Sequence, residues 1–126
     1  MHSNASDRQQ QIRALFDQYI EMYASRDGRL IEHFSDSFSG YTGSGGFLVK
    51  NLGEWQKITR QDFAQVPEPI RIEMLDLVLQ DLSAEVVAAT ALFRIHLPFG
   101  GEMLAKEVAR LTLIFRLEAD TWKIAH

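Results

Sequence analysis

The sequence contains no cysteine, only three prolines and no long apolar run. Without cysteine there are no disulfide bonds and no thiol chemistry, which makes a reducing cytoplasm the natural setting. No segment approaches the roughly eighteen apolar residues that a membrane span needs, and the polar start "MHSNASDRQQQ" has no apolar run of the kind that a signal peptide contains. A net charge of -4 argues against a general nucleic-acid-binding surface. We therefore expect a cytoplasmic protein with no nucleic-acid or membrane partner.

What remains is typical of one folded domain, which we place over residues 1–126. Apolar residues at helical spacing predict a first helix that ends near "SRDG" at 25–28, where Gly28 suits a left-handed cap. "RLIEHF" predicts a short second helix. Asn51 and Glu54 bracket the start of a third helix, which "PEP" at 67–69 ends. Four strand-like segments follow over 70–82, 85–98, 102–120 and 121–126. This order predicts an α+β fold with the helices on one face of an antiparallel sheet.

The glycine-rich stretch "SGYTGSGGFLVKN" at 39–51 raises the possibility of a phosphate-binding loop. Its glycine spacing fits neither a Walker loop nor a Rossmann turn, and the "FLVK" that follows is strand-like. We therefore predict a hairpin and bend in which glycines supply positive φ angles. A narrower alternative is that Lys50, beside the capped start of the third helix, favours a small anion.

The element order and several short segments resemble the NTF2-like superfamily, and within it the SnoaL-like domains found upstream of GGDEF diguanylate cyclase domains in bacterial signalling proteins. The segments are "GYTGSGGFLVKNLGEW", "ITRQDF", "PIRI", "HLPFGG" and "ARLTLIFRLEADTWKIAH". The resemblance covers nearly the whole chain. It implies a cone in which a curved, mainly antiparallel sheet wraps around three N-terminal helices, with a pocket at the wide end. It also implies a homodimer formed through the outer sheet face, and an output domain downstream in a longer chain. The chain ends at His126 inside the last expected strand, so we expect either an excised domain or a short final edge.

Alternation along the long strands separates an apolar face from a mixed one. The apolar face most simply covers the helices. The mixed face carries Arg94, His96, Arg110 and Arg116. Such a surface suits a symmetric dimer interface sealed by charge pairs. The alternative places these residues in the pocket, as a clamp for a carboxylate ligand, because a one-residue bulge would exchange the two faces.

The superfamily also contains ketosteroid isomerases and polyketide cyclases, whose chemistry needs a base in the pocket and a hydrogen-bond donor. Asp76 is the candidate base, because it continues the alternation of Ile70, Ile72 and Met74 and would be desolvated among them. It is equally compatible with a charge turned out to solvent. His96 is a second candidate base, and Tyr19 is a candidate donor that also fits the core stripe of the first helix. The four histidines are scattered, so we expect no metal site and no cofactor.

Aromatic residues from the helices and the hairpin suit the lining of a pocket for a flat or acyl ligand. The candidate ligand-binding residues are Phe34, Phe38, Tyr41, Phe47 and Trp55. The leading hypothesis is a dimeric, non-catalytic module that binds a small molecule and serves a sensory or regulatory role. One alternative is an enzyme resembling ketosteroid isomerase or a polyketide cyclase. The other is a dimerisation scaffold whose cone is filled by side chains.

Overall fold

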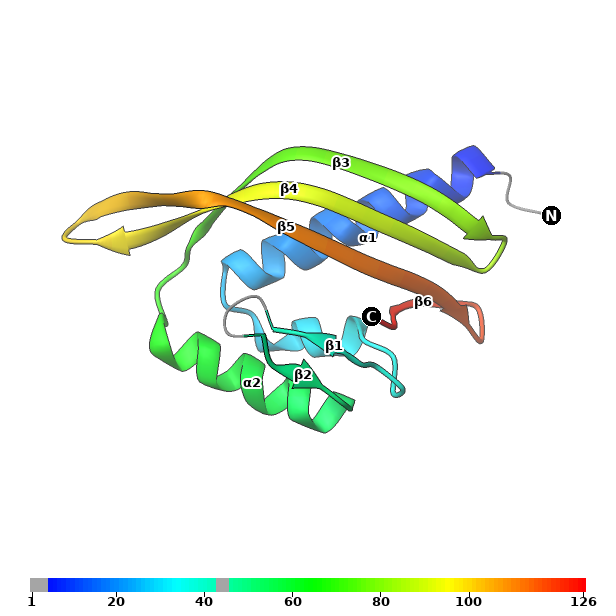
Figure 1. Ribbon diagram of the computed structural model, residues 1–126, viewed down its shortest axis with the longest axis horizontal. Helices are drawn as coiled ribbons and strands as arrows, with labels where there is room; N and C mark the ends of the chain where they lie inside the picture. The colour runs from blue at the N-terminus through cyan, green and yellow to red at the C-terminus, as the bar shows by residue number, and fades with distance from the viewer. Residues whose placement is uncertain (1–4, 43–45) are drawn as a thin grey trace.

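The computed structural model describes residues 5–42 and 46–126. Two α-helices and a 3-10 helix precede four long strands. In chain order the elements are α1 (Ala5–Ala24), η1 (Gly28–His33), β1 (Gly40–Tyr41), β2 (Leu48–Val49), α2 (Leu52–Gln65), β3 (Arg71–Ser83), β4 (Val86–Phe99), β5 (Glu102–Glu118) and β6 (Thr121–Ile124). The strands β3 to β6 form one antiparallel sheet in sequence order. The sheet arches over α1, and α2 lies with the β1–β2 hairpin on the same side (Figure 1). The predicted α+β fold is confirmed.

The junction after α1 differs from the prediction. Arg26, not Gly28, adopts the left-handed conformation (φ 62°), and Gly28 begins η1. This conformation is unfavourable for a residue other than glycine, and the contacts of the Arg26 side chain offset its cost. The guanidinium lies over the rings of Tyr23 and Phe63 and donates a hydrogen bond of 2.9 Å to the carbonyl of Val66. One arginine therefore joins the end of α1 to the end of α2.

The glycine-rich stretch is a hairpin, as predicted. Gly40 pairs with Val49, and Tyr41 pairs with Leu48. Gly46 has a positive φ of 61°, while residues 43–45 of the predicted turn lie outside the described residues. The hairpin leads directly into α2, whose first turn is capped by Asn51: its side-chain oxygen accepts the backbone N–H of Glu54 at 2.9 Å.

A β-bulge in β3 decides which residues of that strand face the helices. Met74 lies opposite Phe93 of β4, but Asp76 lies opposite Leu92, so Leu75 is the extra residue. Beyond the bulge the alternation is reversed, and Leu77 packs towards the core while Asp76 points outwards. The expectation that Asp76 is desolvated beside Ile70, Ile72 and Met74 is therefore wrong.

The core lies between α1, η1 and the inner face of the sheet, with β6 closing one end. Its most completely buried side chains are Ile12, Phe16, Leu30, Val49, Val87, Phe115 and Ile124. A part-buried ion pair of 3.1 Å between Arg8 and Asp81 ties the start of α1 to β3. At the other end, β3 begins opposite His96, so the tip of the β4–β5 hairpin projects past the sheet (Figure 1). No helix in the described part of the chain combines the length and apolarity needed to cross a bilayer.

Candidate functional site

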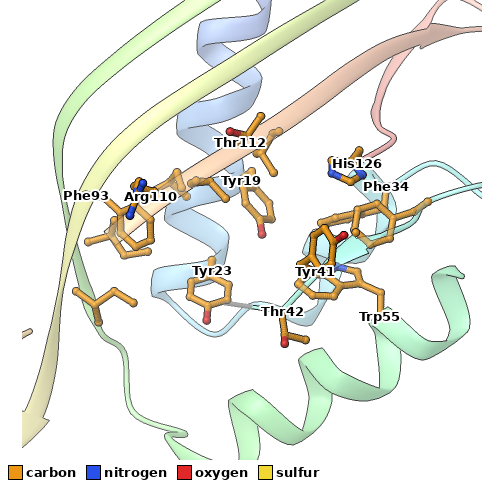
Figure 2. Close-up of a pocket in the computed structure, with 17 residues that line it drawn as sticks. Tyr19, Tyr23, Phe34, Tyr41, Thr42, Trp55, Phe93, Arg110, Thr112 and His126 are labelled. Carbon is orange, nitrogen blue, oxygen red and sulfur yellow. The ribbon is translucent and has the colours of Figure 1, made fainter. Parts of the chain in front are cut away.

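The described residues enclose a cavity of about 360 Å³ between the sheet, α1 and the segment that runs from η1 into α2 (Figure 2). This volume is near the lower end of the roughly 300–1,000 Å³ usual for pockets that hold drug-sized ligands. The lining residues are Tyr19, Ile20, Tyr23, Phe34, Phe38, Gly40, Tyr41, Thr42, Trp55, Ile72, Phe93, Ile95, Arg110, Leu111, Thr112, Leu113 and His126. Most are aromatic or aliphatic, and no aspartate, glutamate or lysine is among them.

Aromatic rings form one wall of the cavity. Trp55 of α2 lies 5.7 Å from Phe34 and 5.4 Å from Phe38, measured between ring centroids, and Phe34 meets Phe38 edge to face at 4.9 Å. Tyr41 and His126 form a second, T-shaped pair at 6.4 Å. Gly40 lines the same wall, where a Cβ atom would approach the Phe38 ring to 3.3 Å. Tilted and edge-on rings at such distances leave flat surfaces on which a planar ligand can stack.

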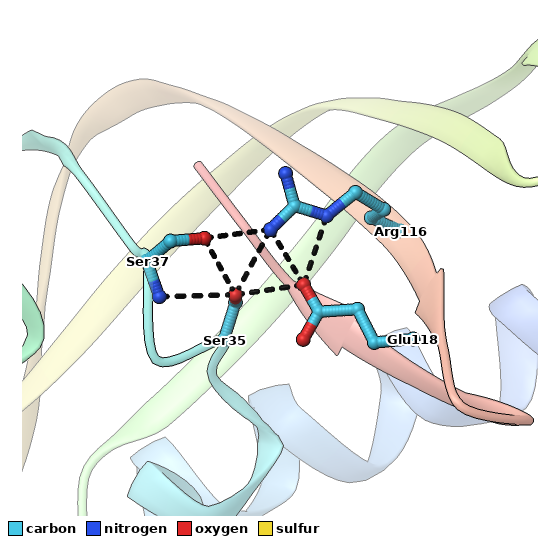
Figure 3. Close-up of polar contacts among 4 residues, drawn as sticks. All are labelled: Ser35, Ser37, Arg116 and Glu118. Atoms are coloured by element: carbon cyan, nitrogen blue, oxygen red, sulfur yellow. Dashed lines mark hydrogen bonds and ion pairs between the residues drawn. The ribbon is translucent and has the colours of Figure 1, made fainter.

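A polar cluster on the other side of the same segment fixes this wall in place (Figure 3). Ser35 and Ser37 lie between the lining residues Phe34 and Phe38 in the chain, and their hydroxyls contact Arg116. The Arg116 guanidinium donates to the hydroxyls of Ser35 and Ser37 at 3.1 and 2.7 Å and to the carboxylate of Glu118. Ser35 also donates to Glu118 at 2.7 Å, and its backbone N–H donates to the carbonyl of Ile124 at 2.8 Å. The hydrogen bond from Ser35 and the Arg116 charge lower the pKa of Glu118.

Two tyrosines of α1 line the cavity, and their hydroxyl groups differ in hydrogen bonding. The Tyr23 hydroxyl donates to the Asp62 carboxylate at 2.7 Å, and burial together with this hydrogen bond raises the pKa of Tyr23 to about 12. Tyr19 is 6% exposed, and its hydroxyl has no hydrogen-bond partner within residues 5–42 and 46–126. Burial raises the pKa of Tyr19 strongly, so the hydroxyl keeps its proton and can only donate or accept as a neutral group.

The structure places most of the predicted pocket residues on the cavity. Phe34, Phe38, Tyr41 and Trp55 line it, as do Tyr19 and Arg110. Phe47 does not, which corrects the prediction for that residue: it is 65% exposed on the outside of the β1–β2 hairpin. The two strands are only two residues long, and Phe47 lies just before β2, where its backbone pairs with Thr42 at the exposed end of the hairpin.

The other predicted residues lie outside the cavity. Asp76 is exposed, and its carboxylate accepts the backbone N–H of Leu77 at the bulge. His96 is on the outer face of the sheet, where it lies 3.0 Å from a Glu73 oxygen, and Arg94 reaches the same oxygen at 3.7 Å. The hydrogen bond with His96 lowers the pKa of Glu73. Of the four residues considered for an anion clamp, Arg110 alone reaches the cavity, since Arg116 is held by the cluster around Glu118.

Sequence reasoning missed the sheet side of the cavity. Ile72, Phe93, Ile95 and Leu111 belong to the face that was expected to cover the helices, and here that face continues past the end of α1. The sequence did contain one indication of this extension, because the predicted strands are long relative to the helices that were expected to cover them. The hydrogen bond between Tyr23 and Asp62 joins residues 39 positions apart, and no pattern in the sequence indicates it. Nowhere in the described ranges do three or more metal-ligating side chains come together.

Comparisons with solved structures show the same fold at low sequence identity. An NTF2-like protein of unknown function from Pseudomonas putida superposes with a TM-score of 0.84 at 15% identity, covering 98% of this chain and 86% of that one. Aln2 from a Streptomyces species gives 0.82 at 8% identity (99% and 90% covered). A candidate ketosteroid isomerase from Shewanella frigidimarina gives 0.73 at 16% identity (90% and 89% covered).

No curated protein sequence matches this chain. The model of the SnoaL-like domain, however, matches residues 12–126, which include most of α1, all the later elements and every residue found to line the cavity. Its fold is that of NTF2-like proteins, and the chain belongs to the SnoaL-like domain family.

Proposed function

We propose that this SnoaL-like domain is a non-catalytic module that binds a small molecule in the aromatic-lined cavity. The observation that carries the proposal is the composition of the lining: a volume of about 360 Å³ surrounded by apolar and aromatic side chains, with no carboxylate or lysine to act as a base. The undescribed residues 1–4 and 43–45 contain no acidic side chain either. A cavity of this size also weighs against a scaffold whose cone is filled.

An isomerase or cyclase is the alternative, favoured by the unpartnered Tyr19 hydroxyl and by the structural similarity to a candidate ketosteroid isomerase. Such an enzyme needs a proton acceptor beside its substrate. The candidates Asp76 and His96 lie outside the cavity, and His126 is the one imidazole among the described lining residues. This alternative predicts that an activity, once found, is lost in His126→Ala and retained in Asp76→Asn and His96→Ala.

A homodimer formed through the outer sheet face is part of the same proposal. That face exposes apolar side chains beside its charges, among them Val78 (61% exposed) and Leu92 (41%), which support burial against a second copy. Ligand binding would then change how two subunits pair and so regulate an output domain. Sedimentation velocity tests the dimer: we expect Leu92→Lys to yield monomers. A wild-type monomer would remove this part of the proposal.

Native mass spectrometry of the purified protein tests the binding function. We expect gentle conditions to reveal protein with an added small-molecule mass, and denaturing conditions to remove that mass. Leu111→Trp places an indole in the cavity and should abolish the added mass. Leu104→Trp is the matched control, because it makes the same change on the same strand at an exposed site outside the lining and should retain the mass. An added mass that survives in Leu111→Trp would contradict the proposal.

A further inference from the structure

We propose that the ligand of this cavity is a small planar organic acid, whose rings stack against the aromatic wall and whose anionic group meets Arg110. This inference rests on the proposed binding function and adds the chemical class of the ligand. It is carried by the charge, the hydrogen-bonding groups and the shape of the lining.

The charge of the lining is one-sided. Among the described residues around the cavity, Arg110 has the single permanently charged side chain, and His126 is the one other group that can become cationic. Two other arginines of the sheet already have acidic partners: Arg94 pairs with Glu73, and Arg116 pairs with Glu118. Arg110 forms no ion pair with any side chain in the described ranges. Its guanidinium is thus available for a carboxylate, which it can hold through two parallel hydrogen bonds.

The position of Arg110 explains how a residue of the outer sheet face reaches the cavity. Four consecutive residues, Arg110 to Leu113, line the cavity, although alternation allows only every second side chain of a strand to face one side. The cavity therefore extends to the edge of β5. Strand β6 pairs with β5 only from Phe115 to Glu118, so this edge is uncovered at Arg110. An anion at Arg110 would lie at the open rim, where its charge stays partly hydrated.

The interior of the cavity offers a hydrogen-bond donor. The Tyr19 hydroxyl has no hydrogen-bond partner among residues 5–42 and 46–126, whereas the neighbouring Tyr23 hydroxyl already donates to Asp62 at 2.7 Å. A buried hydroxyl is stabilised by an acceptor on the ligand, such as a carbonyl or carboxylate oxygen. A donor within and a cation at the rim both favour ligand oxygen atoms.

The shape of the cavity selects a flat ring system. In the view of Figure 2, Arg110 and Phe93 lie on one side, while Trp55, Phe34 and Tyr41 lie on the other. We expect a molecule of one ring or two fused rings to place its face against the aromatic wall and its acidic group towards Arg110. Aliphatic chains would fill the volume but would forgo the stacking.

The test compares two probes of equal shape, 2-naphthoic acid and 2-naphthamide, by isothermal titration calorimetry at pH 7. The amide keeps the rings and the carbonyl oxygen but lacks the charge. We expect the wild-type protein to bind the acid about tenfold more tightly than the amide, as is typical of a charge-assisted hydrogen bond. Because Arg110 is exposed, this preference should shrink as salt is raised.

Single-residue variants test which side chains cause the preference for the acid. Arg110→Gln should abolish the preference, so that the acid binds about as tightly as the amide. Arg60→Gln, which removes an exposed arginine of α2 outside the lining, should keep the wild-type preference. Tyr19→Phe should lower the affinity for both probes to a similar extent, because both retain an acceptor oxygen.

The failures are distinguishable. Equal binding of acid and amide, or a preference for the acid that persists in Arg110→Gln, would overturn the inference about the anion and leave the binding function standing. If neither probe binds, the inference about the ligand is overturned, and the added mass in native mass spectrometry decides whether the binding function stands.

Discussion

The inner face of the sheet has two halves with different packing. Near the β3–β4 turn the face is solid: Val87, Ala89 and Phe115 are buried against Ile12 and Phe16 of α1. Towards the β4–β5 hairpin the same strands present Phe93, Ile95 and Leu111 to a cavity. The residue types and their alternation are alike in both halves. The difference arises because the first part of α1 packs directly on one half, while the other half faces a cavity that the end of α1 and the segment from η1 to α2 also line.

Hydrophobic patterning specifies which face of the sheet is buried, but it does not specify how closely that face is packed. In the solid half, apolar side chains of the sheet pack against apolar side chains of α1, and this burial stabilises the fold. In the hollow half, comparable surface remains available to a ligand.

The largest expected effect is on stability in the solid half. Phe16→Ala removes a fully buried ring and should lower the free energy of unfolding by about 3–5 kcal/mol. Phe93→Ala, in the hollow half, should cost only about 1–2 kcal/mol, because the ring already borders empty volume and makes fewer contacts. Urea unfolding curves measure both. Equal losses would contradict the division of the face into two halves.

The two tyrosines sharpen the contrast within the hollow half. Tyr23→Phe breaks the hydrogen bond with Asp62 and should lower stability by about 1 kcal/mol. Tyr19→Phe removes a hydroxyl that has no partner in the described ranges, so the free energy of unfolding should stay unchanged or rise slightly. Thermal unfolding of the ligand-free variants compares the two. A loss in Tyr19→Phe as large as that in Tyr23→Phe would mean that its hydroxyl is already satisfied.

The polar cluster behind the aromatic wall predicts a pH dependence. Its contacts lower the pKa of Glu118 in the folded state, so its stabilisation is present above the ordinary pKa of 4.5 and is lost as the pH falls through the lowered value. Glu118→Gln should therefore cost about 1 kcal/mol at neutral pH, and the deficit should shrink as the pH falls through the lowered pKa of Glu118.

Glu102→Gln provides the matched control for this prediction, since it removes an exposed carboxylate from the same strand at a site far from the cluster. Its stability profile between pH 7 and pH 3 should follow the wild type. A constant deficit for Glu118→Gln across that range would show that the cluster is not stabilised by the charge of Glu118.

The smallest expected effect is at the bulge on the back of the sheet. Asp76→Asn keeps an acceptor for the backbone N–H of Leu77 and touches neither half of the inner face. Stability should change by less than about 0.5 kcal/mol, and probe binding should be unaffected in the same titrations. Loss of binding in this variant would place Asp76 in the site after all.

The sequence predicted the features that repeat or act locally. Alternation identified the buried face of β4 and β5, and the capping residue Asn51 marked the start of α2. It could not predict the bulge at Leu75, because one inserted residue reverses the two faces without changing composition. Nor could it predict the exposure of Phe47 or the separation between the sheet and α2. These depend on how distant elements pack, as the cluster around Arg116 illustrates.

The central claim is that the hollow half of the sheet binds a small molecule and the solid half does not. Methyl NMR spectra recorded with a library of planar organic acids and their amides test this directly. The account predicts shift changes confined to Ile20, Ile72, Ile95 and Leu111, with Ile12, Leu30 and Ile124 unmoved. Shifts spread equally over both groups, or no shift at the cavity methyls with any compound, would contradict it.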